Sequence, residues 1–441
     1  MKYRVRCLNC GKTYGEDEYV TRCANGCDAM LRTEYEQKQI EPTEDYPGLW
    51  QYINWLPVDD VDSRILEHSS TFHTYRSEKL ADHLGLDNLV ICLNAFRPGQ
   101  QASMKTATFK DIEAELSFQR VLATRENGKP FVLSSDGNIA TAFTYYANML
   151  QYPVVLSVTE EARQHRIWSY WKKNPYVTLL SMKDGCDYYN AIELANQLGQ
   201  SDHFVVEGGA RNVARRDGVG TIVIDATRML GRMPDHYFQA LGSGPGAIAA
   251  YEASLRLQRD GRYGDRLPRI HGAQNAPFAP MYDAWHAGTR CIDTKYQCES
   301  AKNLIRQVHA HVLTNRHPAY DVKGGVYDAL SATNGEFYCI SNEEARRAQE
   351  LFKRLEGCSI VPAAGVTVAS LIQAVEHELV DPDDAILLNI TGGGRQEMEM
   401  KKFKVTPSIT LTRDYDPEQV LHEVLKCNKK LSTQKNSYER E

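Results

Sequence analysis

The chain has 441 residues, a net charge of -6 and 42% hydrophobic residues. This length suffices for two or three units with cores of their own, and the composition is that of a folded globular protein. The acidic balance argues against a surface built to bind nucleic acid, and no apolar run approaches the roughly 18 residues of a membrane span. Because no apolar signal segment opens the sequence, we predict a cytoplasmic protein.

Residues 1–40 hold four of the eleven cysteines, in two closely spaced pairs. Two residues separate Cys7 from Cys10, and three separate Cys23 from Cys27. Two such pairs can place four thiolates tetrahedrally around zinc, and a site of four cysteines has no open position for chemistry. We therefore predict a zinc-binding module with a structural role. The alternative is a small ribbon of four reduced cysteines that has lost its metal.

From about residue 85 onward, short apolar runs alternate with segments of helical periodicity. A helix is expected after Asn138, where apolar residues recur at helical spacing, and another after Ser341, which stands in capping-box spacing to Glu344. Strands alternating with helices predict parallel sheets covered on both faces, an α/β body over residues 41–425, followed by a polar tail over 426–441. The predicted strands are 89–93, 131–134, 154–158, 177–181, 204–206, 237–241 and 385–390.

Lys110 lies in the string Thr-Ala-Thr-Phe-Lys-Asp, residues 106–111, at the start of a predicted helix. A partly buried lysine near a helix N-terminus loses its proton more easily, so its amine becomes nucleophilic enough to form an imine. Most lysines at helix starts are solvated surface groups, so this signal is weak by itself.

A polar loop lies between the predicted strand 131–134 and the helix after it. Backbone N–H groups converge in such a loop and can hold a carboxylate, and Asn138 can reach a ring oxygen of a cofactor. The alternative is an ordinary N-cap turn, which Ser, Asp and Asn also favour. The loop consists of Ser134, Ser135, Asp136, Gly137 and Asn138.

A glycine-rich loop follows the run 237–241 and precedes another predicted helix. Glycines permit close approach of the backbone, and the helix N-terminus favours negative charge, so the loop is suited to a phosphate group. Nucleotides bind to similar loops, but this one lacks the Gly-Lys-Ser/Thr of a P-loop. The candidate phosphate ligands are Gly242, Ser243, Gly244 and Gly246.

Thr391 ends the predicted strand 385–390 and is followed by three glycines. Ligands of α/β sheets bind at the carboxyl ends of strands, where this hydroxyl can hydrogen-bond a pyridine nitrogen. The alternative is a simple turn at a strand end.

The lysine string, the polar loop, the glycine-rich loop and the strand-end threonine follow one another in this order along the chain. Together they resemble the motifs of the fold-type II pyridoxal-phosphate (PLP) enzymes, which share the fold of the tryptophan synthase β chain. The string around Lys110 is similar to the Thr-Gly-Ser-Phe-Lys-Asp string of threonine synthases, several of which also have an N-terminal cysteine module. The resemblance implies that Lys110 is the catalytic Schiff-base lysine. It also implies that the glycine-rich loop holds the cofactor phosphate, that Thr391 contacts the ring nitrogen, and that a smaller subdomain, roughly 110–235, is inserted in a larger one.

The polar loop is similar to the Ser-x-Gly-Asn substrate loop of the same enzymes. By this resemblance Asn138 contacts the cofactor ring and the residues before it contact the substrate. Asp136 and Ile139 depart from the small residue and the threonine or serine often found there, which leaves the carboxylate contacts open.

Three further segments, 207–216, 234–244 and 274–282, resemble the cysteate synthases, a family of threonine synthase paralogues that makes cysteate for coenzyme M in some methanogens. The resemblance extends from Cys7 to about Gly394. It implies a transferase that replaces the phosphate of O-phospho-L-serine by sulfite and releases L-cysteate. Because fold-type II enzymes usually dimerise, it also implies a homo-oligomer.

Both the leaving group and the nucleophile of this reaction are anions, so cationic side chains are expected near the substrate. Two alternatives remain open. One is a threonine synthase acting on O-phosphohomoserine, and the other is a zinc-ribbon protein that binds nucleic acid and carries a degenerate enzyme body. The cationic candidates are Lys105, Arg211, Arg215 and Arg216.

Overall fold

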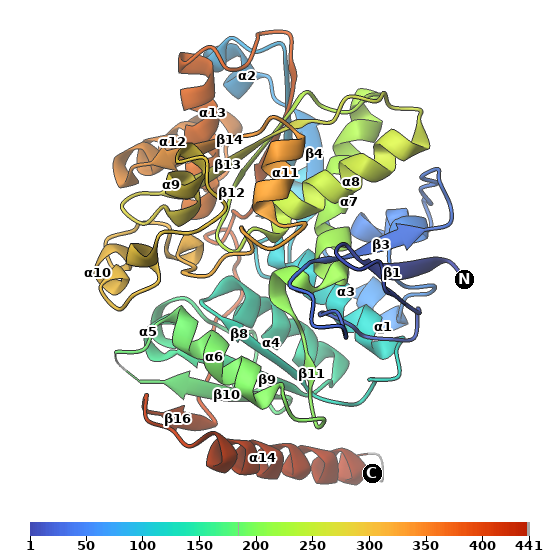
Figure 1. Cartoon of the computed structure of the whole chain (residues 1–441), viewed down its shortest axis with the longest axis vertical. Helices are drawn as coiled ribbons and strands as arrows, with labels where there is room; N and C mark the ends of the chain where they lie inside the picture. The colour runs from blue at the N-terminus through green and yellow to red at the C-terminus, as the bar shows by residue number, and fades with distance from the viewer. Residues whose placement is uncertain (184, 439–441) are drawn as a thin grey trace.

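The computed structural model describes residues 1–183 and 185–438, which form a larger and a smaller sheet-centred unit with a small antiparallel sheet beside them (Figure 1). The larger sheet has six strands in the order β14, β13, β12, β15, β5, β4, and only β4 runs antiparallel to its neighbour. The predicted strands 89–93, 237–241 and 385–390 are confirmed. The strands are β4 His73–Arg76, β5 Asn88–Leu93, β12 His236–Ala240, β13 Arg269–Asn275, β14 Glu336–Ile340 and β15 Ala385–Ile390.

Each face of the larger sheet has its own core, since successive side chains of a strand point to opposite faces. Val90 and Leu387 belong to the core shared with α7 and α8. Ile91 and Leu388 belong to the core shared with α12 and α13. The helices on the two faces are α7 Val213–Leu230, α8 Pro245–Asp260, α12 Asn342–Glu356 and α13 Pro362–Glu376.

The smaller sheet has five parallel strands in the order β11, β8, β9, β10, β16. Four of them were predicted, and all four lie within residues 131–206, inside the smaller subdomain expected over roughly 110–235. At the edges of that range, α3 (Lys110–Leu122) and α7 pack on each other, and α7 packs on α8 of the larger unit. The strands are β8 Phe131–Ser135, β9 Val154–Thr159, β10 Val177–Met182, β11 Val205–Val206 and β16 Ile409–Leu411.

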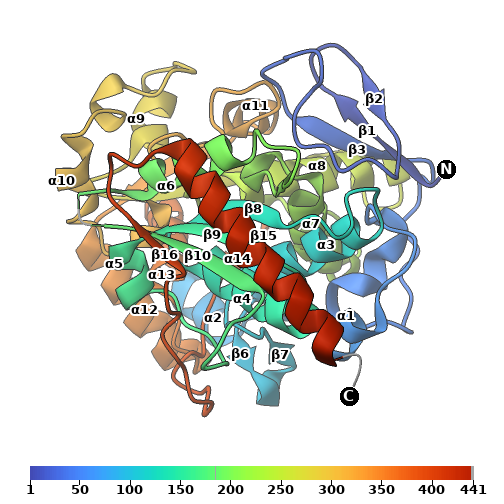
Figure 2. The ribbon, with the colours of Figure 1, turned by 90° about the horizontal axis from the view of Figure 1, so that it is seen from below.

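The C-terminal helix α14, Pro417–Tyr438, runs across the smaller unit (Figure 2). Its Val420 and Val424, one turn apart, join the core that contains Leu180 of β10 and Leu194 of α6. Residues 426–438, predicted as a polar tail, therefore continue a helix that is anchored to the smaller sheet. Residues 439–441 lie outside the described part of the chain.

The remaining helices connect and cover the strands. The capping box predicted at Ser341 is confirmed, because its hydroxyl accepts from the backbone N–H of Glu344 and the Glu344 carboxylate accepts from Ser341. The α-helices are α1 Ser63–Glu67, α2 Lys79–Leu84, α3 Lys110–Leu122, α4 Asn138–Leu150, α5 Glu160–His165, α6 Tyr188–Leu198, α9 Pro280–His286, α10 Ala301–Ile305 and α11 Val326–Ala332. The 3₁₀ helices are η1 Gly48–Trp55, η2 Pro98–Gln100, η3 Gly209–Arg211, η4 Thr294–Tyr296 and η5 His311–Leu313, and a short ribbon pairs β6 Phe96–Arg97 with β7 Ala102–Ser103.

The cysteine-rich module forms a three-stranded antiparallel sheet of β1 Tyr3–Cys7, β2 Thr13–Tyr14 and β3 Leu31–Tyr35. It packs against the larger unit, where the Tyr35 hydroxyl donates to Asp217 over 2.7 Å. The cysteine-rich module is therefore docked on the larger unit. Among the helices of the described residues, none combines the length and apolar character needed to cross a bilayer.

Candidate active site

A cavity of about 540 Å³ is lined by residues of both units, at the carboxyl ends of β8, β12 and β15. Its size is that of a small-molecule site, and its position is the one where α/β sheets bind ligands. Most of the residues singled out in the sequence meet around it. These are Lys110, Ser134, Ser135, Asp136, Gly137, Asn138, Arg211, Arg215, Gly242, Ser243, Gly244, Gly246 and Thr391.

Lys110 is the first residue of α3, as predicted. The start of this helix is tied to β15, because the backbone N–H of Phe109 donates to the carbonyl of Thr391 over 3.1 Å. The Lys110 ammonium forms an ion pair with Glu113, one turn further along the helix. Burial lowers the pKa of Lys110, and the Glu113 carboxylate opposes that shift. The amine thus lies half-buried in the cavity wall, held by a carboxylate that is itself fully buried.

The polar loop is partly a helix cap and partly a binding surface. The Ser135 hydroxyl accepts from the backbone N–H groups of Gly137 and Ala140, at 3.1 and 2.9 Å, so it caps α4. Asn138 accepts at Oδ1 from Arg395 over 2.5 Å. Since arginine can only donate, this contact orients the amide with Oδ1 toward Arg395, which leaves the Nδ2 group as a donor for an acceptor in the cavity.

The glycine-rich loop leads directly into α8, whose N-cap residue is Gly244 with φ +91° and no side-chain cap. A Cβ atom at Gly246 would lie 2.3 Å from the Gln239 side chain, and one at Gly244 would lie 2.3 Å from Val326. A larger residue would be strained at Gly244, where φ is positive, and would have to displace the Gln239 side chain at Gly246. The uncapped first turn of α8 and the bare loop together form a cradle that suits a phosphate group.

Two of the predicted cationic residues are not lining residues of this cavity. Arg216 is 1% exposed, and its guanidinium binds Glu252 and the carbonyls of Ala210 and Leu31. Lys105 lies before the helix start, where its carbonyl accepts from a tyrosine hydroxyl. Neither residue is a candidate for contact with an anion in the cavity.

Arg215 does line the cavity, but its charge is already matched. Its Nε donates to Glu207 over 2.6 Å, and its Nη1 donates to Glu113 over 2.9 Å. Arg211 is different, because its carboxylate partner, Asp28, has a side chain that is 77% exposed to water. Of the predicted arginines, Arg211 is therefore the best placed to meet an incoming anion.

The cysteine module also reaches the cavity, which the sequence did not indicate. Thr21, Arg22 and Asp28 belong to the lining. Burial lowers the pKa of Arg22, and the charge of Arg211 adds to that shift, so the two guanidinium groups lie near each other at the rim. Other lining residues missed in the sequence are Tyr188, Asn315 and His317, which stand in segments with no motif, and Gln239, which lies in a predicted strand.

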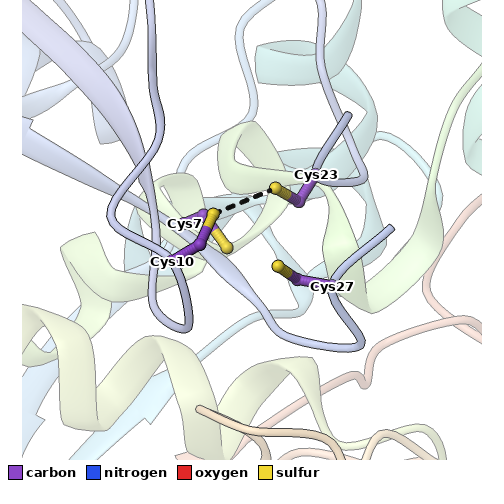
Figure 3. Close-up of side chains that lie close together, drawn as sticks. All are labelled: Cys7, Cys10, Cys23 and Cys27. Atoms are coloured by element: carbon purple, nitrogen blue, oxygen red, sulfur yellow. Dashed lines mark hydrogen bonds between the residues drawn. The ribbon is translucent and has the colours of Figure 1, made fainter. Parts of the chain in front are cut away.

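The sulfur atoms of Cys7, Cys10, Cys23 and Cys27 all lie within 4.8 Å of one another (Figure 3). The Sγ atoms of Cys10 and Cys23 are 3.5 Å apart. Sulfur ligands of one tetrahedral zinc ion stand about 3.8 Å from each other, by the usual Zn–S length. The four thiolates therefore fit a metal ion, in agreement with the spacing of the two pairs.

Comparisons with known proteins agree with this geometry. A family model described as pyridoxal-phosphate dependent enzyme matches residues 74–392. A cysteate synthase from Methanosarcina mazei is 44% identical over 413 residues, which cover 93% of this chain and 97% of that protein. A cysteate synthase from Methanocella paludicola is 43% identical over 407 residues, covering 91% and 93%.

The solved structures extend the comparison to the fold. Maize serine racemase superposes with a TM-score of 0.53 at 12% identity, over 73% of this chain and 88% of that one. A pyridoxal 5'-phosphate-dependent aspartate racemase gives 0.54 at 12% identity, over 78% and 98%. At such identity the likeness concerns the fold alone, and it confirms the predicted fold-type II architecture.

Proposed function

The chain belongs to the pyridoxal-phosphate dependent enzymes and, among them, to the cysteate synthases, and from this premise we propose that it converts O-phospho-L-serine and sulfite into L-cysteate and phosphate. One observation carries the proposal to this chain's own residues. A single cavity gathers a half-buried lysine, an uncapped glycine-rich helix start and a strand-end threonine, which come from three distant parts of the sequence. They are the three groups that a PLP enzyme of this fold requires.

The residues fit the cofactor one by one. The loop before α8 would hold the phosphate through backbone N–H groups. Asn138 would donate from Nδ2 to the ring oxygen, and the Thr391 hydroxyl would meet the ring nitrogen. When bound, PLP supplies an electron sink that stabilises negative charge at Cα of the substrate.

Lys110 would move the proton at that carbon. Lys110 lines the cavity, so with cofactor and substrate bound its amine would stand beside Cα. From there it can remove the Cα proton and return it after sulfite has replaced phosphate at Cβ. Arg22 and Arg211, at the rim, would attract both anions.

The proposal is tested by measuring phosphate release from O-phospho-L-serine with and without sulfite. We expect phosphate and cysteate in equal amounts when sulfite is present, with the product identified by mass spectrometry. Phosphate release from O-phosphohomoserine with formation of threonine would instead support the threonine synthase alternative. The structure does not support the nucleic-acid-binding alternative. The cysteine module packs on the larger unit and lines the cavity of the candidate active site.

Asp136 should make the affinity for sulfite depend on pH. Burial raises the pKa of this carboxyl to about 7, although Arg166 opposes the shift. Below pH 7 the side chain is mostly neutral, and above pH 7 its negative charge repels anions in the cavity. We expect the affinity of wild type relative to Asp136→Asn to fall by about threefold to tenfold between pH 6 and pH 8.

The quantity to measure is the KM for sulfite of wild type divided by that of Asp136→Asn. Sulfite itself also titrates in this pH range, but it does so equally for both enzymes, so the ratio removes its contribution. A ratio that stays constant over this range would contradict the role of Asp136.

We also propose that the four cysteines bind zinc and that the metal stabilises the module. Metal analysis of protein purified without chelator should then find about one zinc per chain. Cys10→Ser should lower the melting temperature and the metal content together, because it leaves three thiolates for the ion. Cys291→Ser, a change at an exposed cysteine outside the cluster, is the control. Unchanged stability in Cys10→Ser protein with no zinc in wild type would rule out the site.

The cytoplasmic location and the homo-oligomer remain predictions.

A further inference from the structure

Lys110 and Glu113 belong to a buried cluster of four charged side chains. The Glu113 side chain is fully buried, and one of its oxygens accepts from Lys110 while the other accepts from Nη1 of Arg215. Arg215 also binds Glu207 through Nε and Nη2. The two cations and two carboxylates sum to zero charge.

Glu207 completes this cluster on the side away from the lysine. Its oxygens accept from the side chain of Asn212 over 2.7 Å and from the backbone of Gly209 over 3.0 Å. Arg215 thus has a fixed partner that does not depend on Glu113. Glu113 is the member whose Oε1 accepts a hydrogen bond from the lysine amine.

The charge of the cluster changes by one whenever Lys110 gains or loses a proton. An ammonium group in a buried site is unstable unless a carboxylate compensates it. Around this amine the compensation comes from Glu113 on α3, with Glu207 behind it, whereas Arg215 on α7 opposes the positive charge. Tyr188 on α6 also faces the cluster, and it is neutral below its raised pKa of about 12.

We propose that Glu113 is a positioning residue for Lys110, which holds the amine at the start of α3 and stabilises it in each step in which it carries a proton. The inference rests on the proposed role of Lys110 as the cofactor lysine. It gives Glu113 a part in the reaction as well, because Lys110 becomes an ammonium when it removes the Cα proton, and Glu113 binds that ammonium.

The test follows covalent capture of PLP by cofactor-free protein as a function of pH, monitored by absorbance. Capture requires the neutral amine, whose nitrogen attacks the aldehyde carbon as water leaves. Because Glu113 stabilises the ammonium, Glu113→Gln should move the midpoint of the pH profile downward by at least about one unit. Glu113→Asp, which keeps the charge, should remain close to wild type.

Glu115→Gln is the matched control. Glu115 is also buried on α3, but it accepts from Ser69, Ser70 and Tyr146 and has no contact with the lysine. It should leave the midpoint in place. Should Glu113→Gln not fold, Glu207→Gln removes a charge from the same cluster without a contact to Lys110, and a smaller downward shift is expected.

The possible failures are distinguishable. If wild type captures no PLP at Lys110, as judged by peptide mapping after borohydride reduction, the proposed function fails. If capture occurs at Lys110 but folded Glu113→Gln, or folded Glu207→Gln in its place, keeps the wild-type midpoint, the role of Glu113 is overturned. A merely structural role would lower stability without moving the midpoint.

Discussion

Lys110→Ala should yield a folded protein that no longer holds PLP covalently and forms no cysteate. Among the described residues that line the cavity, Lys110 is the one lysine, so no other amine is placed to replace it. Loss of a general base alone slows enzymes by about 10²- to 10⁴-fold, and here the same group also holds the cofactor. We therefore expect turnover to fall by more than about 10³-fold.

Borohydride reduction of the wild-type enzyme, followed by peptide mapping, measures this assignment without any assay of turnover. The label should be found on Lys110. Lys105→Ala serves as the matched control, because Lys105 lies five residues earlier and is not a lining residue of the cavity. Labelling of Lys105, or covalent PLP in the Lys110→Ala protein, would contradict the assignment.

Arg211→Gln should slow the reaction with sulfite by about 10- to 100-fold, within the range by which a charge at the mouth of a cleft raises the association rate of an oppositely charged ligand. The guanidinium lines the cavity, and its carboxylate partner is largely exposed to water and so competes weakly for it. A neutral thiol gains little from a positive charge, so its reaction with phosphoserine should change much less. The selectivity for sulfite over a thiol is therefore the quantity to measure.

Arg228→Gln is the control for this variant. Arg228 lies at the other end of α7, where it contacts Tyr52 and not the cavity. If Arg211→Gln slows the reactions with sulfite and with the thiol equally, Arg211 stabilises the structure of the rim and does not attract the anion.

The sequence predicted the local structure of several segments that line the cavity, because each has a local cause. A lysine at a helix start, glycines before a helix and a threonine at a strand end can all be recognised from neighbouring residues. Their meeting in one cavity follows from parallel strands, whose carboxyl ends lie at the same edge of a sheet.

Charge pairing could not be predicted, because it depends on contacts between distant segments. Arg215 and Arg216 are adjacent in sequence, yet one pairs with Glu207 and Glu113 and the other with Glu252. The Lys110–Glu113 pair has a local spacing, three positions apart on one helix face, yet it was not predicted either. The contribution of Arg22 to the rim likewise depends on how the cysteine module docks.

Three strands of the larger sheet, β4, β13 and β14, were not predicted, and β13 shows a related reason. The strand β13 contains His271, Gln274 and Asn275, all fully buried. Because these residues are polar, the sequence does not show that the strand lies in the core. These side chains are satisfied by partners far away in sequence; His271, for example, bonds to His236 and to Tyr338. The spacing of apolar residues along the sequence cannot reveal hydrogen bonds of this kind between buried polar side chains.

The most direct test of the proposed reaction gives the PLP-loaded enzyme O-phospho-L-serine, O-phosphohomoserine and sulfite in one mixture and identifies the products by mass spectrometry. We expect L-cysteate to accumulate with an equal amount of phosphate while O-phosphohomoserine is left intact. Threonine as the product, with no cysteate formed, would contradict the account.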